Sequence, residues 1–376
     1  MRYHKRILKD NIICRGIIMK KLNLAIIGQG RSGKDIHCAH LTSERNQLFN
    51  IKYVVDADEF RRNKALNLYE GSKVFADYKD LFNVNDIDVV VNASYSENHY
   101  EITKDLLSHG FNVMVEKPFG RNRYECNDLI KTAKDNGVKL AVFQQTFFAP
   151  FFIEAYKLVK SGKLGDIKQI NIRYNGFSRR WDWQTLLKKL AGSTYNTGPH
   201  PIGMALGFLD FDKNAKVVYS KLDTCLTSGD ADDYSKILIT APNKPLVDVE
   251  MHSIDAYCGY NLKIMGSKGT YLSDTMSWYK LKYIVDGENP ERPVQETFLK
   301  NEAGEPIYCS EKLITHEEEG KFNGSAFDVG TQKIYEDLYK YLTGEKDNLY
   351  VTCEMARDVI GVIEQVHAVN PLERKF

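Results

Sequence analysis

The chain has 376 residues, of which 43% are hydrophobic and 27% are charged. This length favours two domains of about 150 residues, each able to bury a core. The 51 basic and 50 acidic residues leave a net charge of +1, which disfavours a nucleic-acid binder. No apolar run approaches the ~20 residues that cross a bilayer. Seven scattered cysteines without a Cys-x-x-Cys pair argue against disulfides and structural zinc. We therefore expect a cytoplasmic protein that binds neither membranes nor nucleic acids.

Residues 1–18 are basic and carry only short apolar fragments. They lack the continuous apolar stretch of about 7–15 residues and the cleavage site that define a signal peptide. Met19 directly precedes the first convincing strand and would make a natural start. We expect residues 1–18 to be a disordered extension, or to come from a gene prediction that starts too early.

Residues 19–144 alternate short apolar runs with amphipathic stretches. Strands are predicted at 22–27, 51–56, 87–92, 112–115 and 139–142, with a weaker one at 73–75, and helices are clearest at 98–109 and 124–136. Buried strands that alternate with helices indicate a parallel sheet with right-handed crossovers. This part is predicted to be an α/β Rossmann domain.

Residues 145–376 follow a different pattern. A helix is predicted at 147–160, strands near 168–174, 216–222, 235–240, 246–252 and 262–265, and two closing helices at 327–342 and 353–369. Several strands alternate polar and apolar residues, which is typical of a sheet with one solvated or interface face. We predict an α+β domain with an open, mostly antiparallel sheet and helices on one face. Residues 287–305 are polar and contain Pro290 and Pro293, so a long loop is expected there.

A glycine-rich run directly follows the first predicted strand and precedes a helix. It consists of Gly28, Gln29, Gly30, Arg31, Ser32 and Gly33. In a Gly-x-Gly-x-x-Gly motif the first glycine permits a tight turn, the second lets the backbone approach a pyrophosphate, and the third lets helix and strand pack closely. The helix N-terminus then favours phosphate. The motif predicts a dinucleotide site, with a ligand-free glycine-rich turn as the alternative.

Asp56 ends the second predicted strand. Rossmann domains place an acid there to bind the hydroxyls of the adenosine ribose. Because a carboxylate repels a 2′-phosphate, NAD is favoured over NADP, although Arg61 and Arg62 could offset that repulsion. The alternative for Asp56 is an N-cap of the next helix.

Glu116, Lys117 and Pro118 follow the strand at 112–115, at the sheet edge where ligands bind. A partly desolvated lysine beside a nicotinamide has a lowered pKa and can exchange a proton with a substrate hydroxyl. A solvated loop lysine is the alternative.

Together these motifs resemble the glucose–fructose oxidoreductase / inositol dehydrogenase / MocA family of NAD(P)-dependent sugar and cyclitol dehydrogenases. The resemblance runs from residue 22 to the end of the chain and also rests on residues 94–99, on Asn196-x-Gly198-x-His200 and on the Gly-Ser-Lys-Gly turn at 266–269. It implies a Rossmann domain beside an open-faced sheet domain, with the active site between them. It also implies a homo-oligomer, a dimer or tetramer formed through the sheets.

By this resemblance Lys117 is the acid/base or proton relay, and His200 lies at the reacting hydroxyl. The family has an aspartate where this chain has Asn196, which can orient a hydroxyl but cannot act as a base. Family members commonly have an arginine where this chain has Phe147. The expected cofactor contacts also include Ser94, His99, Glu116, Lys117 and Gln145, with a purely structural role as the alternative for His99.

An aromatic and charged segment, Arg179-Arg180-Trp181-Asp182-Trp183, precedes Asn196. Tryptophan faces stack on the C–H faces of sugars, and charged side chains bind hydroxyls. The predicted substrate contacts are Arg180, Trp181, Trp183, Tyr195 and Asn196, with an interface or core cluster as the alternative.

Asp248, Glu250 and His252 share one face of a predicted strand, because side chains alternate along a strand. Carboxylate and imidazole groups are suitable metal ligands, but we expect a solvated or subunit-facing sheet surface and predict no metal.

The sequence thus predicts an NAD-dependent oxidoreductase that transfers a hydride between a secondary hydroxyl of a sugar, glycoside or cyclitol and nicotinamide. Lys117 and His200 handle the proton. One alternative is an NAD-dependent glycoside hydrolase that uses transient oxidation and elimination. The other is a non-catalytic nucleotide-binding regulator, a hypothesis based on the departures at Asn196 and Phe147.

Overall fold

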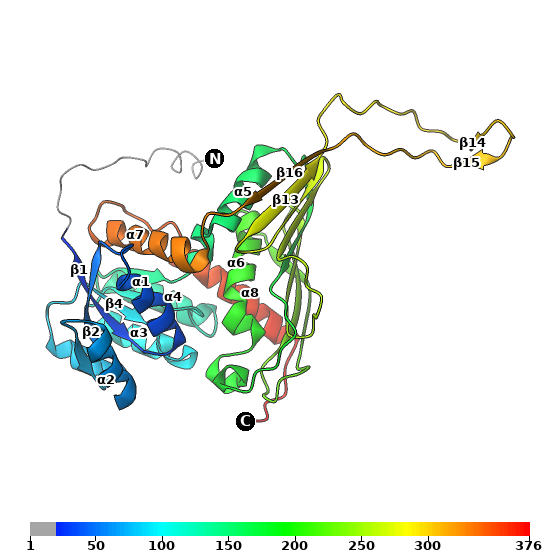
Figure 1. Cartoon of the computed structure of the whole chain (residues 1–376). Helices are drawn as coiled ribbons and strands as arrows, with labels where there is room; N and C mark the ends of the chain where they lie inside the picture. Colours follow the sequence, from blue (N-terminus) through cyan, green and yellow to red (C-terminus); the bar gives the residue numbers. More distant parts are fainter. Residues whose placement is uncertain (1–19) are drawn as a thin grey trace.

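The computed structural model describes residues 20–376 and shows two sheets side by side (Figure 1). The predicted extension 1–18 lies outside the described residues. The first sheet has six parallel strands in the order β3-β2-β1-β4-β5-β6. These are β1 (Leu22–Ile27), β2 (Phe49–Val55), β3 (Lys73–Phe75), β4 (Val89–Asn92), β5 (Val113–Val115) and β6 (Leu140–Val142). The order is that of a doubly wound dinucleotide-binding sheet, so the Rossmann prediction is confirmed.

Helices connect these strands. They are α1 (Ala39–Leu41), α2 (Glu59–Leu68), α3 (His99–Ser108) and α4 (Arg123–Asp135). Two of them begin at side-chain caps: Asp58 accepts hydrogen bonds from two amides of α2, and Asn122 accepts one from α4. The cap of α2 is thus Asp58, which leaves the Asp56 carboxylate available for another role.

The second sheet has eight strands in the order β16-β13-β12-β11-β7-β10-β9-β8. These are β7 (Ile167–Arg173), β8 (Lys216–Asp223), β9 (Tyr234–Thr240), β10 (Leu246–His252), β11 (Leu262–Gly266), β12 (Gly269–Ser273), β13 (Trp278–Tyr283) and β16 (His316–Lys321). Every pair is antiparallel except β7 with β10. The predicted fold class is confirmed.

The helices of this part are α5 (Pro150–Ser161), α6 (Pro199–Phe208), α7 (Thr331–Leu342) and α8 (Cys353–Val369). Figure 1 shows α6 and α8 on one side of the sheet. Ile170, Ile172, Val247 and Val249 are fully buried toward that side, while the alternating residues of β7 and β10 are only partly buried. The other side, here called the open face, carries these alternating polar residues.

The predicted turn at 266–269 is present and joins β11 to β12. Two other expectations for this part are wrong in detail. The helix predicted at 147–160 begins at Pro150 after a short 3₁₀ turn at 145–148, because proline is favoured in the first helical turn. The loop predicted at 287–305 is one side of a long two-stranded projection that ends in β14 (Leu299–Lys300) and β15 (Pro306–Ile307).

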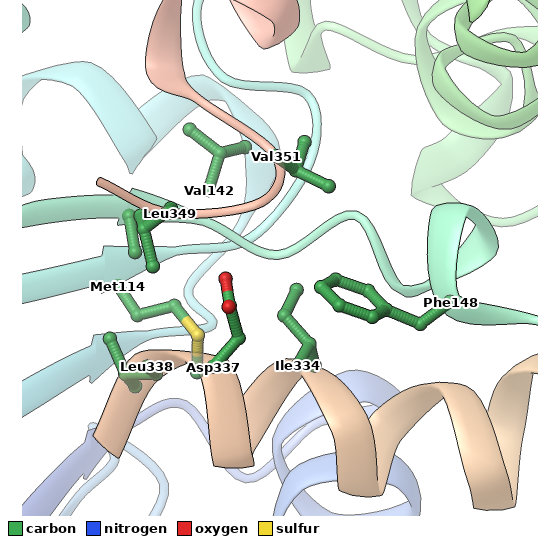
Figure 2. Close-up of a pocket in the computed structure, with 9 residues that line it drawn as sticks. Met114, Val142, Phe148, Ile334, Asp337, Leu338, Leu349 and Val351 are labelled. Carbon is green, nitrogen blue, oxygen red and sulfur yellow. The ribbon is translucent and has the colours of Figure 1, made fainter. Parts of the chain in front are cut away.

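Helix α7 packs against the first sheet, although the two are far apart in sequence. Figure 2 shows Ile334 and Leu338 of α7 facing Met114 of β5 and Val142 of β6. On the same helix, Tyr335 packs edge-on against Phe49 of β2. The two parts of the chain therefore share one continuous core.

Within residues 20–376, no helix is both long and apolar enough to cross a membrane.

Candidate active site

The glycine-rich turn joins β1 to a π-helical segment, Gly33–Cys38, that continues into α1. Gly28 has φ +92°, and a Cβ there would overlap the carbonyl oxygen of Ala93. A Cβ at Gly33 would overlap the carbonyl oxygen of Gly28, whereas one at Gly30 would have no heavy atom within 4 Å. The first and third glycines are thus required by the protein itself. The second faces open space, as expected where a pyrophosphate approaches the backbone.

Asp56 lies just beyond β2 and is buried. Its carboxylate accepts hydrogen bonds from the amide of Gln29 at 2.7 Å and the amide of Asp58 at 2.9 Å. The guanidinium of Arg61 is 3.6 Å away, while that of Arg62 donates to the carbonyl oxygen of Asp56. The acid therefore stands beside the glycine-rich turn, as the ribose-binding prediction requires, and also holds that turn in place.

Other predicted cofactor contacts surround the turn. The side chain of Gln29 accepts a hydrogen bond from Tyr69 at 3.1 Å, and Arg31 is exposed. Ser32 precedes the π-helical segment without capping it through its side chain. The hydroxyl of Ser94 donates to Asn92 at 2.7 Å. Gln29 and Ser94 thus already have protein partners.

His99 is buried at the start of α3. Its Nδ1 lies 2.8 Å from the carbonyl oxygen of Pro118, and its Nε2 lies 3.1 Å from that of Ser94. Burial lowers the pKa of His99, so the ring is neutral and donates to one carbonyl at a time. These contacts tie together the loops that follow β4 and β5, which favours the structural alternative for this residue.

Lys117 follows β5 at the carboxyl edge of the parallel sheet. Its Nζ donates to the backbone carbonyl oxygen of Asn196 at 2.9 Å, which bridges the two domains. Burial lowers the pKa of Lys117; the neighbouring Glu116 opposes this shift, and the positive charges of Arg31 and Arg180 add to it. A lysine with a lowered pKa can act as a base.

Glu116 lies behind Lys117 and is buried. Its Oε1 is 3.1 Å from Nε2 of His37, and Nδ1 of His37 is 2.8 Å from the hydroxyl of Tyr335. Burial alone would raise the pKa of Glu116, but its hydrogen bond with His37 and the charges of His37, Lys117 and His99 bring it to about 2. The ionised Glu116 thus supports the lysine from within the protein, since its Oε2 also accepts the Lys117 amide at 3.0 Å.

His200 lies at the start of α6, on the other side of the interdomain contact. Its Nδ1 is 2.7 Å from the hydroxyl of Thr146. Burial and the charge of Lys117 lower the pKa of His200 to about 3, so the ring is neutral at ordinary pH. No residue from 20 to 376 makes a hydrogen bond with its Nε2.

Asn196 lies in a π-helical turn, Ser193–Thr197, just before α6. Its side-chain oxygen accepts a hydrogen bond from Gln184 at 3.1 Å, while its backbone oxygen holds Lys117. The structure thus brings together Lys117, Asn196 and His200.

The residues of the aromatic segment and Tyr195 make contacts in different places. Trp183 packs edge-on against Tyr95, with ring centroids 5.0 Å apart. Arg180 pairs with Asp182 at 2.7 Å, and Trp181 is 80% exposed. Tyr195 points elsewhere: its hydroxyl donates to the carbonyl oxygen of Arg121 at 2.8 Å, and its ring stacks on His367. Arg180 is close enough to Lys117 for its charge to lower the pKa of the lysine, whereas the hydroxyl of Tyr195 is held by the loop that precedes α4.

Gln145, another predicted cofactor contact, and its neighbour Gln144 are buried. Gln144 donates to the carbonyl oxygen of Pro199 at 3.0 Å, next to His200. Within the described part of the chain, the side-chain oxygens of Gln144, Gln145 and Gln184 have no hydrogen-bond donor.

Sequence reasoning missed four supporting residues: His37, Thr146, Gln184 and Tyr335. His37 lies four residues after Gly33, so the sequence alone could predict that it lies on the helix after the glycine-rich turn. Its partners lie in the loop after β5 and in α7, which no local pattern connects.

Asp248 and Glu250 are not part of this site. Both carboxylates accept hydrogen bonds from Lys236 on the open face, at 2.7 and 2.6 Å. Within residues 20–376, no group of three or more His, Cys, Asp or Glu side chains is arranged to hold a metal ion.

A glycine-rich turn beside an acid, with a lysine of lowered pKa at the carboxyl edge of the same sheet, is typical of a dinucleotide-binding domain. Comparison with known families agrees. Residues 22–144 match the oxidoreductase family with an NAD-binding Rossmann fold, and residues 152–272 match the GFO/IDH/MocA C-terminal domain. The chain belongs to the GFO/IDH/MocA family of oxidoreductases, and the predictions of the family and of an NAD-binding domain are confirmed.

Known relatives have low sequence identity to this chain but match it over most of its length. Inositol 2-dehydrogenase 2 of Saccharopolyspora erythraea is 27% identical over 66% of this chain and 72% of its own length. The scyllo-inositol 2-dehydrogenase (NADP(+)) IolU of Bacillus subtilis is 26% identical over 78% of this chain and 90% of its own. Among solved structures, GenD2 from gentamicin A biosynthesis, in complex with NAD, superimposes with a TM-score of 0.74 at 18% identity, over 95% of this chain and 96% of its own.

Proposed function

We propose that the protein is an NAD-dependent dehydrogenase that oxidises a secondary hydroxyl of a sugar, glycoside or cyclitol, with Lys117 as the base. The observation that carries this proposal is the Lys117 amine. It is partly buried, has a lowered pKa, and lies between the glycine-rich turn and the domain that carries His200. A neutral amine that donates one hydrogen to Asn196 keeps a lone pair for the proton of a substrate hydroxyl.

The cofactor fits the residues present. The open space at Gly30 suits the pyrophosphate, and the Asp56 carboxylate suits the hydroxyls of the adenosine ribose. When bound, the oxidised nicotinamide supplies the acceptor for the hydride that leaves the carbinol carbon. The buried charge of Asp56 supports NAD over NADP, because a 2′-phosphate would meet a carboxylate.

His200 orients the substrate in this proposal. Thr146 fixes one ring nitrogen, so the other remains for the reacting hydroxyl. Because the pKa of His200 is lowered to about 3, the imidazole forms a hydrogen bond but does not hold the proton. Lys117 therefore takes the proton, and His200 directs the hydroxyl toward it.

Two kinds of observation support a polyhydroxylated substrate. The side-chain oxygens of Gln144 and Gln184 are buried acceptors without a donor within residues 20–376, and a buried acceptor without a partner costs about 1–3 kcal/mol. Hydroxyl groups of a substrate can donate to them. The relatives named as inositol dehydrogenases act on compounds of this type, and Arg180 and Trp183 are suitable further contacts.

The test combines a substrate panel with a matched pair of variants. Sugars, glycosides and inositols are offered with NAD and with NADP, and formation of the reduced cofactor is followed by absorbance. Lys117→Ala should lower kcat/KM by at least about 100-fold while NAD binding, followed by tryptophan fluorescence, is retained. Lys188→Ala removes an exposed lysine from the neighbouring segment and should leave both unchanged.

Other outcomes would contradict the proposal. Substrate-dependent NAD reduction that persists in Lys117→Ala excludes this lysine as the base. Release of a sugar without net formation of NADH favours the glycoside hydrolase, and NAD binding without turnover of any compound favours the regulator.

A further inference from the structure

Three buried polar side chains lie behind the turn that carries Asn196. Thr194 donates its backbone amide to one carboxylate oxygen of Asp232 at 2.8 Å and its hydroxyl to the other at 2.9 Å. The same hydroxyl lies 2.8 Å from Nε2 of His367, in the last turn of α8. Asp232, Thr194 and His367, here called the buried network, therefore form a continuous chain of hydrogen bonds from the loop before β9 to the end of α8.

The direction of each hydrogen bond in the buried network follows from the groups involved. An ionised carboxylate only accepts, so the hydroxyl proton of Thr194 points to Asp232. The hydroxyl oxygen then accepts from His367, whose Nε2 must carry a hydrogen. Burial lowers the pKa of His367 to about 4, so this ring is neutral. The Thr194 hydroxyl is thus held by a partner at its hydrogen and by another at its oxygen.

The carboxylate of Asp232 is costly for the fold. Burial raises its pKa to about 7, and Asp233 adds to this shift, although both hydrogen bonds from Thr194 oppose it. Among residues 20–376, the one basic side chain within 4 Å of the carboxylate is the neutral His367, at 3.9 Å. The folded chain therefore loses stability as the pH rises from 3.8 to about 7. Acids with a pKa perturbed in this way cluster at functional sites.

The buried network fixes the turn Ser193–Thr197 from within the second domain. Besides the contacts of Thr194, the amide of Ser193 donates to the carbonyl oxygen of Asp232 at 2.7 Å. Gly192, just before the turn, has φ +96°, and a Cβ there would lie 2.3 Å from Oδ1 of Asp232. The acid and the turn therefore approach each other more closely than a residue with a side chain would allow.

The same turn contacts the first domain at two points. The backbone oxygen of Asn196 accepts a hydrogen bond from the Lys117 amine at 2.9 Å, and the hydroxyl of Tyr195 donates to the carbonyl oxygen of Arg121 at 2.8 Å. The ring of Tyr195 also stacks on His367, with centroids 5.0 Å apart. A shift of the turn would therefore move the group that holds the Lys117 amine.

We propose that the buried network positions the base of the reaction: it fixes the turn so that the carbonyl oxygen of Asn196 holds the Lys117 amine toward the substrate hydroxyl. The three side chains act through Asn196 and are positioning residues. This inference rests on the proposed function, in which Lys117 takes the proton. Because a shift of about 1 Å in a reacting group can lower a rate about 100-fold, a hydrogen bond lost from the network should lower kcat while NAD binding is retained.

A matched pair of variants at Thr194 tests the proposal. Thr194→Val keeps the shape and the backbone amide but removes the hydroxyl, whereas Thr194→Ser keeps the hydroxyl. At pH 8, where Asp232 is ionised, Thr194→Val should lower kcat about tenfold with the KM for NAD unchanged, and Thr194→Ser should retain kcat within about twofold. Thr343→Val removes a hydroxyl at the end of α7 and should change neither. A folded Thr194→Val variant with the kcat of the natural chain overturns the proposal.

His367→Phe gives a second test. It keeps an aromatic ring against Tyr195 and removes the nitrogen that donates to Thr194. We expect a similar loss of kcat, and the double variant with Thr194→Val should lose no more than Thr194→Val alone, because both changes break the same chain of hydrogen bonds. Losses that multiply overturn the proposal, since they would show that the two side chains act separately.

The reactivity of Lys117 can be measured without turnover. Trace acetylation with labelled acetic anhydride, followed by mass spectrometry, compares Lys117 with the exposed Lys188 in the same molecule. A carbonyl acceptor favours the charged amine, so Thr194→Val should raise the relative reactivity of Lys117 at least about twofold, the lower end of what one hydrogen bond contributes.

The two measurements separate this proposal from the proposed function. An unchanged relative reactivity of Lys117 in Thr194→Val overturns the positioning role, even where the natural chain reduces NAD with a substrate. A natural chain that turns over no compound contradicts the proposed function, while a raised reactivity in Thr194→Val still supports the hold of the buried network on the lysine.

Discussion

At the scale of single residues, the surroundings of Lys117 set its pKa. Asn196, whose backbone oxygen accepts a hydrogen bond from Lys117, has an amide side chain and no charge, so Glu116 is the acid that opposes the pKa shift of Lys117. Arg31 and Arg180 add positive charge nearby. The amine is therefore kept closer to its neutral form than an aspartate would allow.

The pH profile follows from these charges. A base acts when it is deprotonated, so kcat/KM for oxidation should rise with pH and level off below the usual lysine pKa of 10.5. His200, with a pKa of about 3, should add no inflection above pH 4. Asn196→Asp should move the inflection upward by about 1 unit, because an opposite charge favours the ammonium form.

Kinetics from pH 5 to pH 10 would check this profile, with Asn214→Asp as a control on an exposed turn. An inflection near pH 6.5 that disappears in His200→Asn would contradict the assignment, because it would show that the imidazole titrates in the working range.

The positions of the candidate site residues were predictable where the chemistry is local, and their roles stay predictions. The three glycines, Asp56 and Lys117 lie in short segments whose spacing reports their surroundings. The contacts behind the lysine were not predictable, since the hydroxyl of Tyr335 reaches His37 across 298 residues of chain. The hydroxyl contact of Tyr195 was hidden for the same reason, because Arg121 lies in the other domain.

At the scale of elements, two glycines of the glycine-rich turn are expected to have different roles, Gly30 in NAD binding and Gly33 in folding. Gly30→Ala should leave the thermal midpoint within about 2 °C, because a Cβ there meets nothing within 4 Å and surface changes are usually small. It should weaken NAD binding at least tenfold by obstructing the pyrophosphate. Gly33→Ala should instead destabilise the fold, because its Cβ would overlap the Gly28 carbonyl.

Calorimetry and NAD titration would check both variants. Gly30→Ala with unchanged NAD affinity would exclude this turn as the pyrophosphate site. A Gly33→Ala variant as stable as the natural chain would show that the close approach of turn and helix is not required.

The sheets differ in how well sequence predicts them. The Rossmann strands are apolar and buried on both faces, so each is recognisable alone. Strand β16, with the sequence His-Glu-Glu-Glu-Gly-Lys, is an edge strand and almost wholly exposed. It forms because it pairs with β13, where Lys280 and Lys282 meet Glu319 and Glu317. Such pairing depends on tertiary context rather than local propensity.

At the scale of the whole molecule, α7 joins the two parts of the chain. Leu338 is buried against the first sheet (Figure 2). Leu338→Ala should lower the free energy of unfolding by about 2–4 kcal/mol through lost burial and a cavity. Because the core is continuous, urea unfolding should remain one transition with both domains lost together.

Fluorescence and far-UV circular dichroism would measure that transition, with the exposed Leu66→Ala on α2 as the control. Two separate transitions in Leu338→Ala would show that the domains unfold independently.

The position of α7 also has a consequence for synthesis of the chain. The first sheet is complete at Val142, but the helix that covers part of it begins only at Thr331. At the ribosomal rate of about 5–20 residues per second, roughly 10–40 s separate these events. During that interval Met114 and Val142 lack their final cover. The nascent amino-terminal half should therefore be a client of chaperones that bind apolar surface, until the last eighth of the chain emerges.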